Sequence, residues 1–372
     1  MTSPLLFTPA TVGPITLPNR IMVSPMCQYS AIDGNANHWH TAHLGSLALS
    51  GAGLLCVEAT AVNPEGRITP NCVGLYNNDN QQALAGVIGT LRAASPVKLM
   101  IQLGHAGRKA SSACPWDGGQ QLSSADGGWE AVAPSALPHK EGEAAPRAMT
   151  REEIDRVIAD FASAAARARE LGFDAIEVHA AHGYLLHQFL SPLANARDDD
   201  YGGSLENRLR LTMEVFAAVR KAAGSGMAVG ARLSASDWVD GGWDIEDCVV
   251  LARRLQAAGA DFLDVSSAGV SPLQKITIGP GYQVHFAERI RREVTIPIVS
   301  VGLITEPQQA EAILQAGQAD IVALARAFIA NPRWPWRAAA ELGGQLRGHP
   351  QYYRCLPSGH PRIFGDVTTN QR

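Results

Sequence analysis

The sequence predicts an α/β protein, a (β/α)8 TIM barrel, from three observations. Short runs of apolar and β-branched residues recur eight times along the chain, and the segments between them have helical periodicity. Several runs are almost uninterrupted in hydrophobicity, which is typical of parallel strands covered on both faces. No G-x-G-x-x-G motif follows the first run. The competing arrangement, a doubly wound open sheet, therefore lacks its main sequence argument, and we favour the closed barrel.

The eight predicted strands alternate with helices along the chain. They cover residues 20–26, 53–62, 98–103, 175–180, 228–236, 262–268, 297–302 and 321–328. The helix after the third strand has a clear start, because Thr150 stands three residues before Glu153 and the two form a predicted capping box. Gly172 and Gly259 stand where two of the helices should end.

Length alone leaves the number of domains open, since 372 residues suit either two average domains or one barrel with long loops. We predict a single barrel over residues 1–340. Within it, residues 110–149 are rich in Gly, Ser, Ala and Pro and lose periodicity, so we interpret them as a long loop after strand 3, a lid or pocket wall on the catalytic face. Residues 341–372 lie outside the eight units and are predicted to form a C-terminal arm.

Composition and charge favour small-molecule partners. The chain is 46% hydrophobic and 18% charged, and its net charge of -4 gives no basic field for nucleic acid or an anionic membrane. The N-terminus has no basic region followed by an apolar stretch, and no run of about 18 apolar residues occurs. The 6 cysteines are too scattered for a C-x-x-C pair, so neither a zinc ribbon nor an iron–sulfur cluster is indicated. We expect a soluble cytoplasmic protein.

In a TIM barrel the active site forms at the C-terminal ends of the strands. The candidate residues at the first five ends are Ser24, Pro25, Met26, Cys27, Tyr29, Ala59, Thr60, Gln102, His105, His179, His182, Tyr184 and Arg232. Strand 7 ends at Gly302, and strand 8 contains Ala325 and Arg326. These last two strands are where barrel enzymes commonly hold a phosphate with backbone N–H groups.

Arg232 lies in a strand otherwise made of small and apolar residues, where a permanently charged guanidinium needs an anion. A barrel carboxylate such as Glu58 or Glu177 could be its partner. A cofactor that becomes anionic when it is reduced would satisfy the same charge.

His179, His182 and Tyr184 follow one another closely at the end of strand 4. The histidines could be ordinary hydrogen-bonded residues, or two ligands of a zinc ion, which needs a third protein ligand that the sequence does not obviously supply. Alternatively, both imidazoles donate hydrogen bonds to a substrate oxygen, each contributing about 3 kcal/mol. Tyr184 is then a general acid, since a phenol with a pKa of about 10 stays protonated at neutral pH, or else a wall residue.

Two further side chains have open interpretations. Cys27 is an apolar filler, a thiol that tunes a redox cofactor, or a nucleophile. Gln102 carries a donor and an acceptor in one plane, which matches the edge of a uracil-like ring.

These residues resemble the Old Yellow Enzyme family of FMN-dependent ene-reductases, in its bacterial thermophilic-like and xenobiotic-reductase branch. The similarity covers nearly the whole barrel and is most specific between His179 and Arg208. The matching stretches are LPNRIMVSPMCQY, GAGLLCVEATAVNPEGR, IQLGHAGRKA, EVHAAHGYLLHQFLSPLANARDDDYGGSLENR, GARLSASDW, SVGLI and LARAFIANP.

The resemblance implies one FMN per barrel and no metal. The residues that would bind FMN are Ser24, Pro25, Met26, Cys27, Ala59, Gln102, Arg232, Gly302, Ala325 and Arg326. Arg232 would lie beside flavin N1, where a fixed cation stabilises the reduced anion. Ala325 departs from many relatives, which have glycine there; this would matter if the position needed a positive φ.

The resemblance also implies a reaction in which NADPH or NADH reduces the flavin and an activated alkene then takes its place. His179 and His182 would hold the carbonyl oxygen, and flavin N5 would deliver hydride to the β-carbon. Tyr184 would protonate the α-carbon, Tyr29 would line the pocket, and Cys27 would adjust the flavin potential or the substrate fit.

The segment PQYYRC (350–355) resembles the part of related enzymes that reaches into a neighbouring subunit. Arg354, with Tyr352 or Tyr353, would then complete a partner's pocket in a homodimer or homotetramer. The remaining alternatives are an FMN protein with another acceptor or a sensing role, and a metal-dependent barrel hydrolase.

Overall fold

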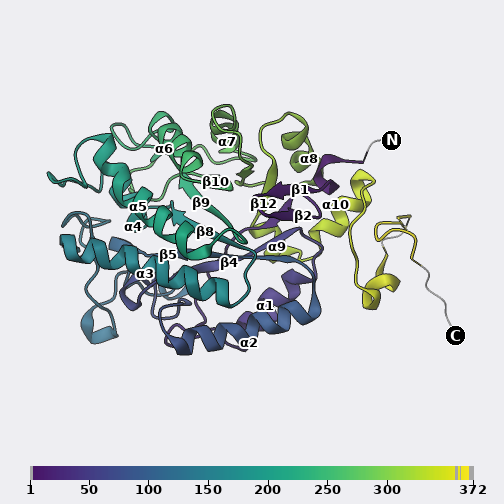
Figure 1. Ribbon diagram of the computed structural model, residues 1–372, viewed down its shortest axis with the longest axis horizontal. Coiled ribbons are helices and arrows are strands. Elements are labelled where there is room, and N and C mark those ends of the chain that lie inside the picture. The colour runs from purple at the N-terminus through teal and green to yellow at the C-terminus, as the bar shows by residue number, and fades with distance from the viewer. Residues whose placement is uncertain (1–2, 357–358, 361, 368–372) are drawn as a thin grey trace.

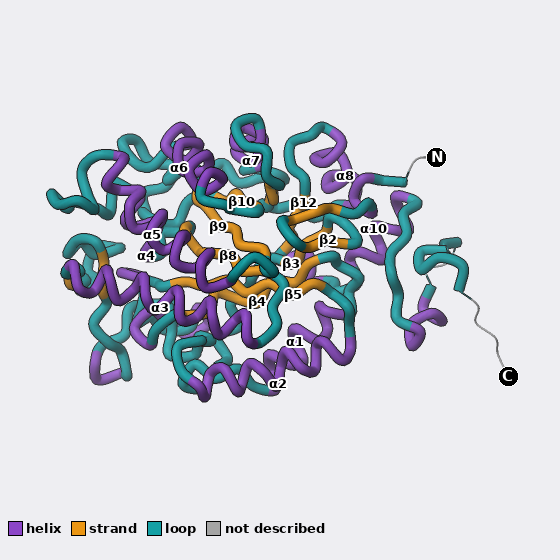
Figure 2. The backbone as a smooth tube through the Cα atoms, viewed as in Figure 1, coloured by secondary structure: helices purple, strands orange, loops and turns teal. Residues whose placement is uncertain are grey.

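The structure is a computed structural model that describes residues 3–356, 359–360 and 362–367. Eight parallel strands close into a barrel in the order β10-β11-β12-β3-β4-β5-β8-β9, with helices around it (Figures 1 and 2). The barrel strands are β3 (Ile21–Val23), β4 (Leu54–Ala61), β5 (Lys98–Gly104), β8 (Ala175–Ala180), β9 (Ala228–Ser234), β10 (Phe262–Ser266), β11 (Ile298–Ser300) and β12 (Ile321–Leu324). The predicted TIM barrel is confirmed, and each predicted strand overlaps one of these.

Other elements lie outside the barrel strands. Two small sheets pair β1 (Ala10–Val12) with β2 (Ile15–Leu17) and β6 (Val132–Ala133) with β7 (Arg147–Ala148). The α-helices are α1 (His38–Ala48), α2 (Asn78–Ala94), α3 (Arg151–Glu170), α4 (Leu185–Leu190), α5 (Leu205–Ala223), α6 (Ile245–Ala257), α7 (Val284–Arg291), α8 (Pro307–Gln315), α9 (Arg326–Ala330) and α10 (Trp334–Leu342). The 3-10 helices are η1 (Leu5–Phe7), η2 (Pro64–Gly66), η3 (Gly107–Lys109), η4 (Pro115–Asp117), η5 (Ser124–Asp126) and η6 (Pro350–Cys355).

The predicted helix signals hold at both ends. Thr150 accepts a hydrogen bond from the backbone of Glu153, whose side chain accepts one in return, so the capping box at the start of α3 is confirmed. Gly172 and Gly259 have φ of +78° and +88° directly after α3 and α6. This left-handed backbone ends a helix and costs glycine little.

The β1–β2 hairpin, which was not predicted from the sequence, covers the N-terminal end of the barrel. Its buried Val12 and Leu17 belong to one apolar cluster with the interior side chains Met22, Met100 and Phe262. Because these side chains fill the lower barrel, the hairpin end contributes stability and the opposite end is left for a site.

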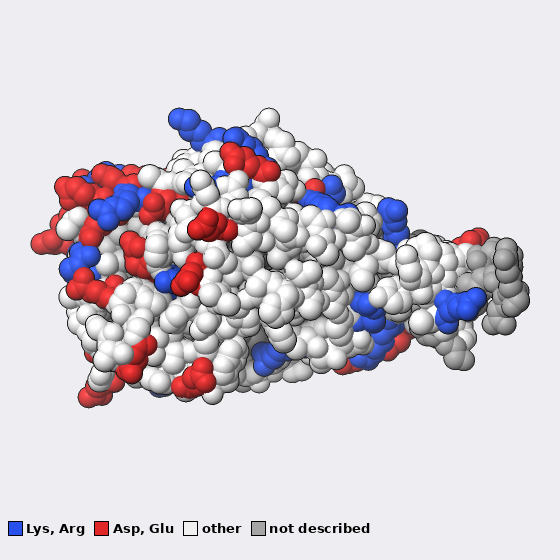
Figure 3. All heavy atoms as spheres, turned by 90° about the horizontal axis from the view of Figure 1, so that it is seen from below, with Lys and Arg blue, Asp and Glu red and all other residues white. Residues whose placement is uncertain are grey.

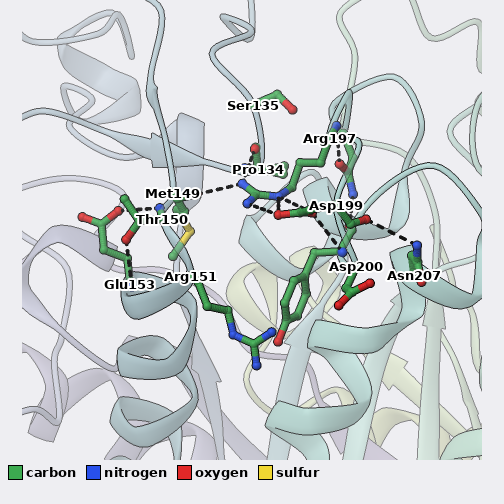
Figure 4. A network of polar contacts seen from close by, with 12 residues as sticks. Pro134, Ser135, Met149, Thr150, Arg151, Glu153, Arg197, Asp199, Asp200 and Asn207 are labelled. Carbon is green, nitrogen blue, oxygen red and sulfur yellow. Dashed lines mark hydrogen bonds and ion pairs between the residues drawn. The ribbon is translucent and has the colours of Figure 1, made fainter.

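The long loop (110–149) is tied down at its base. The Arg197 guanidinium donates hydrogen bonds to the carbonyls of Pro134 (2.9 Å) and Met149 (2.8 Å), and it pairs with Asp199 at 2.6 Å (Figure 4). These contacts join the loop to the segment between α4 and α5, so it forms a fixed wall beside the C-terminal ends of the strands.

The described part of the predicted C-terminal arm (341–372) extends beyond the barrel on the side of the β1–β2 hairpin (Figure 1). Part of it packs on its own barrel, because the Tyr352 ring lies 5.5 Å from that of Trp336 and the Arg333 guanidinium lies 5.0 Å from the Tyr352 ring. Residues 357–358, 361 and 368–372 of the predicted arm lie outside the described residues.

Charged side chains are unevenly spread over the surface. On the face in Figure 3, Asp and Glu gather at the end opposite the arm, and much of the middle carries no charge. Within the described residues, no helix combines the length and the apolar character needed to cross a bilayer.

Candidate active site

The end of β8 and the turn after it bring His179, His182 and Tyr184 together. The His179 ring lies 5.1 Å from the His182 ring and 5.0 Å from the Tyr184 ring, centroid to centroid. His182 has a φ of +59° and Gly183 one of +71°. These two left-handed residues reverse the direction of the chain. The Tyr184 side chain, five residues after His179, therefore faces back toward the end of β8.

Burial controls the ionisation of this cluster. Burial, with the cations of Arg232 and Lys109 adding to it, lowers the pKa of His179 and of His182 well below the usual range. Burial raises the pKa of the Tyr184 phenol. Near neutral pH the cluster therefore holds two neutral imidazoles, each with one N–H to donate, and one protonated phenol. His179 Nδ1 is buried without a hydrogen-bond partner in the described part of the chain.

A buried polar layer lies inside the barrel near these rings. Arg232 Nε lies 3.2 Å from Asp264 Oδ2, and Gln102 Nε2 donates to Glu177 Oε1 at 2.7 Å. The predicted pairing of Arg232 with a barrel carboxylate is confirmed, but neither of the predicted candidates, Glu58 and Glu177, is the partner. Asp264 is the partner because it lies directly beside Arg232 in the β9–β10 register.

The two carboxyl groups of this layer, those of Glu177 and Asp264, are both fully buried. Burial raises the pKa of Glu177 to about 8, and the nearby Asp264 carboxylate adds to the rise. Two carboxylates close together in a low dielectric seldom both ionise. Glu177 therefore keeps its proton near neutral pH, and Asp264 balances the Arg232 cation.

The ends of β3 and β4 form an open wall beside the cluster. The part-exposed side chains on it are Pro25, Met26, Cys27, Tyr29 and Ala59. Ala59 lies at an irregularity where the β4–β5 register shifts between Val57 and Thr60. Burial, with the Glu58 carboxyl adding to it, raises the pKa of the Cys27 thiol. A protonated thiol is a poor nucleophile, so the structure gives no support to a nucleophilic Cys27.

The ends of β11 and β12 differ in part from the prediction. Gly302 has a φ of +130°, and a Cβ there would lie 2.6 Å from Gln283 Cγ, so glycine is required. Ala325 has a φ of -113°, so this position does not need the positive φ that would favour glycine. Arg326 was predicted inside strand 8, and this is wrong: β12 ends at Leu324 and Arg326 is the exposed first residue of α9. The apolar run simply continues from strand into helix.

Several residues around the site were missed by sequence reasoning. Lys109 Nζ donates to the carbonyls of His182 (2.8 Å) and Gly269 (3.1 Å) and lies 5.0 Å from the Tyr184 ring centroid. Ser266 Oγ lies 2.7 Å from His182 Nε2. Only the basic pair at the end of GHAGRK gave a signal for Lys109, and nothing local marks the serine.

Two of the predicted arrangements, the Arg354 site and a zinc site on the histidine pair, are not assembled within this chain. Arg354 is exposed on η6 in the C-terminal arm. The histidine pair lacks a third ligand: among the described residues, no group of three or more His, Cys, Asp and Glu side chains could hold a metal ion.

The wall, the polar layer and the β11 end suit a flavin. Ser24 Oγ and Ser300 Oγ are buried without a hydrogen-bond partner among the described residues. Small and apolar side chains can lie against an aromatic ring system, the Gln102 amide can meet its pyrimidine edge, and Arg232 can balance its charge. The donor set therefore fits FMN.

Comparisons with known proteins agree with this arrangement. The profile of the NADH:flavin oxidoreductase / NADH oxidase family matches residues 5–345. An NADPH dehydrogenase from Geobacillus sp. (strain WCH70) is 44% identical over 352 residues, which is 94% of this chain and 98% of that protein. One from Bacillus subtilis (strain 168) is 41% identical over 351 residues, with the same coverage of 94% and 98%.

Solved structures show the same likeness. Morphinone reductase in complex with tetrahydroNAD superposes with a TM-score of 0.75 at 30% identity, covering 93% of each chain. An Old Yellow Enzyme homologue from Zymomonas mobilis has a TM-score of 0.75 at 28% identity, covering 95% of this chain and 99% of that one.

Fold, site and relatives define a flavin oxidoreductase built on a TIM barrel. The chain belongs to the NADH:flavin oxidoreductase / NADH oxidase family and, within it, to the Old Yellow Enzyme family. It is an NADPH dehydrogenase of that type, with FMN as cofactor and NAD(P)H as reductant.

Proposed function

We propose that this enzyme is an ene-reductase that reduces the activated C=C bond of α,β-unsaturated carbonyl compounds and related electron-poor xenobiotics. One observation carries the proposal: the His182 imidazole and the Tyr184 phenol ring lie 5.1 Å and 5.0 Å from the neutral His179 imidazole, centroid to centroid, at the flavin-compatible end of the barrel. The three groups offer what such a substrate needs, namely donors for its oxygen and a proton for its carbon.

His179 and His182 bind the carbonyl oxygen. Each neutral imidazole has one N–H, so the pair can donate two hydrogen bonds to one acceptor. As negative charge develops on that oxygen, the two fixed donors stabilise it, and the β-carbon becomes more electrophilic. Burial favours this role because hydrogen bonds are stronger where water is excluded.

Tyr184 is the proton donor. Its raised pKa keeps the phenol protonated at neutral pH, and its ring lies beside the His179 ring, so a carbonyl held by the histidines would bring the adjacent α-carbon toward the phenol. Lys109, 5.0 Å from the ring centroid, stabilises the phenolate left after proton transfer. Tyr29 lines the mouth of the pocket.

When bound, FMN supplies a hydride from N5, which NAD(P)H has delivered to it beforehand. The chain would hold it with Ser24, Pro25, Met26, Cys27, Ala59, Gln102, Arg232, Gly302, Ala325 and Arg326. Arg232 would balance the charge of the reduced ring, and the exposed Arg326 would assist with the phosphate. Cys27 would modulate the potential as a neutral thiol.

The C-terminal arm suggests a shared site. Arg354 is exposed, while Tyr352 packs against Arg333 and Trp336 and holds this part of the arm. We infer that Arg354 completes the substrate pocket of a second subunit in a homodimer or homotetramer.

An anaerobic visible spectrum tests the proposal. The purified protein should show flavin bands that bleach with NADPH and return with cyclohexenone. Bleaching without return would favour a flavoprotein with another acceptor or a sensing role, and it would overturn the ene-reductase assignment.

A further inference from the structure

The turn that carries His182 and Tyr184 is strained and closely packed. His182 and Gly183 both have a positive φ, of +59° and +71°. A side chain at Gly183 has no room, since a Cβ there would lie 2.1 Å from the Gly269 carbonyl oxygen. A non-glycine residue in this conformation costs on the order of 1 kcal/mol, so the surroundings must hold the turn in place.

Side chains from other elements hold the His182 peptide groups. The His182 N–H donates to Ser234 Oγ at 2.9 Å, and the His182 carbonyl accepts from Lys109 Nζ at 2.8 Å. Ser234 comes from the end of β9 and Lys109 from η3. This half of the turn is thus fixed from two sides of the barrel mouth.

Gly183 is held by two residues of α4. Its N–H donates to His187 Nδ1 at 2.8 Å, and its carbonyl accepts from Gln188 Nε2 at 2.7 Å. Hydrogen bonds therefore hold both peptide groups of Gly183, and these two groups connect His182 to Tyr184. A change in either bond would tilt the two rings relative to each other.

His187 is itself held by a buried carboxylate. His187 Nε2 lies 2.9 Å from Asp237 Oδ1, and both side chains are 0% exposed. Asp237 Oδ2 accepts hydrogen bonds from Ser191 Oγ at 2.6 Å and from the Trp243 N–H at 2.8 Å. Burial raises the pKa of Asp237, but the contact with His187 and these hydrogen bonds lower it by more, so the carboxylate is ionised.

The bonds of His187 define its tautomer. Nδ1 accepts the Gly183 N–H, so it carries a lone pair and no proton. The ring proton is therefore on Nε2, which lies 2.9 Å from Asp237 Oδ1. The carboxylate accepts only, so it selects the one neutral tautomer that can hold Gly183.

We propose that His187 and Asp237 are positioning residues for the reduction: through Gly183 they set the orientation of the His182 imidazole and the Tyr184 phenol. The proposal rests on the proposed roles of those two side chains. Neither His187 nor Asp237 touches the reacting atoms, and their effect passes through one backbone N–H.

The tautomer of His187 can be measured in the wild-type holoenzyme, so this test does not depend on an activity assay. Imidazole 15N NMR of the FMN-bound protein should show His187 with its proton on Nε2 at neutral pH, the signal being assigned by its absence in His187→Gln. A proton on Nδ1, or a doubly protonated ring, would overturn the proposal, because neither form can accept the Gly183 N–H.

Asp237→Asn tests the consequence. The asparagine oxygen is needed at the Oδ2 position by Ser191 and Trp243, which leaves its NH2 facing His187 Nε2. His187 must then move its proton to Nδ1, against the Gly183 N–H. Since small misplacements of reacting groups cost on the order of 100-fold in rate, we expect kcat with cyclohexenone to fall by about that factor, with little change in KM.

A quinone acceptor separates positioning from a general structural defect. A quinone would accept the hydride equivalent that the flavin supplies and needs one further proton, at an oxygen, which water can deliver, so its reduction does not need the Tyr184 proton. Asp237→Asn should therefore lower cyclohexenone turnover far more than quinone turnover. Equal losses with both acceptors would overturn the proposal.

Ser191→Ala is the matched control. It removes one hydrogen bond to the same buried carboxylate but leaves the carboxylate, and so the His187 tautomer, unchanged. This variant should keep the wild-type ratio of cyclohexenone turnover to quinone turnover. A loss of cyclohexenone turnover as large as that of Asp237→Asn would overturn the proposal. If wild-type enzyme reduced no enone at all, the proposed function would fail, whereas the NMR result would still report the tautomer.

Discussion

Asp264 Oδ2 lies 3.2 Å from Arg232 Nε at directly adjacent positions of β9 and β10, inside the barrel. The charge that Arg232 can offer to a flavin is therefore already partly balanced by the protein. Asp264→Asn removes that balancing charge, so the reduced flavin anion should become more stable. We expect the two-electron midpoint potential to rise by about 30 mV or more, which corresponds to about 1.4 kcal/mol.

The midpoint potential can be measured by equilibration with a reference dye. Asp261→Asn is the control, since Asp261 pairs with Arg220 at 2.7 Å and stands before β10 at the far end of the barrel. It should leave the potential unchanged. A fall in potential in Asp264→Asn would show that Arg232 does not act on the flavin as proposed.

Tyr184→Phe removes the proposed proton donor and leaves the ring. Reduction of the flavin by NADPH should continue at nearly the wild-type rate, because that half-reaction needs no phenol. Its reoxidation by cyclohexenone should slow by 10²–10⁴-fold, the typical contribution of a general acid. Stopped-flow absorbance resolves the two half-reactions. Tyr201→Phe, whose phenol bonds Glu214 outside the site, should slow neither.

The double variant His179→Ala with His182→Ala removes both donors to the substrate oxygen. Each preorganised donor contributes about 3 kcal/mol, so enone reduction should fall by several orders of magnitude while the flavin stays bound. Steady-state turnover and the flavin-to-protein absorbance ratio measure the two effects. Near-normal turnover would remove the role of the histidines in activating the oxygen.

The raised pKa of Glu177 makes the free energy of unfolding depend on pH. Its pKa in the folded protein is about 8, above the 4.5 expected for an exposed glutamate. Below pH 4.5 both states hold the proton, and between 4.5 and 8 only the folded state does. The free energy of unfolding should therefore decrease as the pH rises through this window.

Glu177→Gln isolates that contribution, because an amide mimics the protonated carboxyl and does not titrate. Thermal unfolding of the flavin-bound proteins should show that Tm falls less in the variant than in the wild type between pH 5 and pH 8. This range lies close to the window between the two pKa values of Glu177, 4.5 and about 8. Glu58, whose pKa burial also raises to about 8, is present in both proteins and cancels. Parallel curves would mean that Glu177 is ionised throughout.

Arg354→Ala tests the shared pocket. If Arg354 reaches the site of a second subunit, the variant should raise KM for the enone without loss of flavin. Arg362→Ala is the control, since this arginine is also exposed in the arm, with 79% of its side chain accessible. Equal KM values for wild type and Arg354→Ala would argue against a shared site.

The barrel and one part of the site could be predicted from the amino-acid sequence. Apolar runs long enough to be buried on both faces predicted the eight strands, because that burial pattern depends on local composition alone. The spacing of His179, His182 and Tyr184 likewise indicated a common strand end. Both signals are local: a strand and the turn after it lie within a few residues of each other.

Tertiary structure decided the partners of those residues. Asp264 balances Arg232 because of the register of two strands, and Lys109 reaches the His182 carbonyl from η3, which follows the neighbouring strand β5. Asp237 selects the tautomer of His187 from a loop 50 residues further along the chain. Register, burial and the direction of a hydrogen bond arise only when distant segments pack together, so no local pattern in the sequence encodes them.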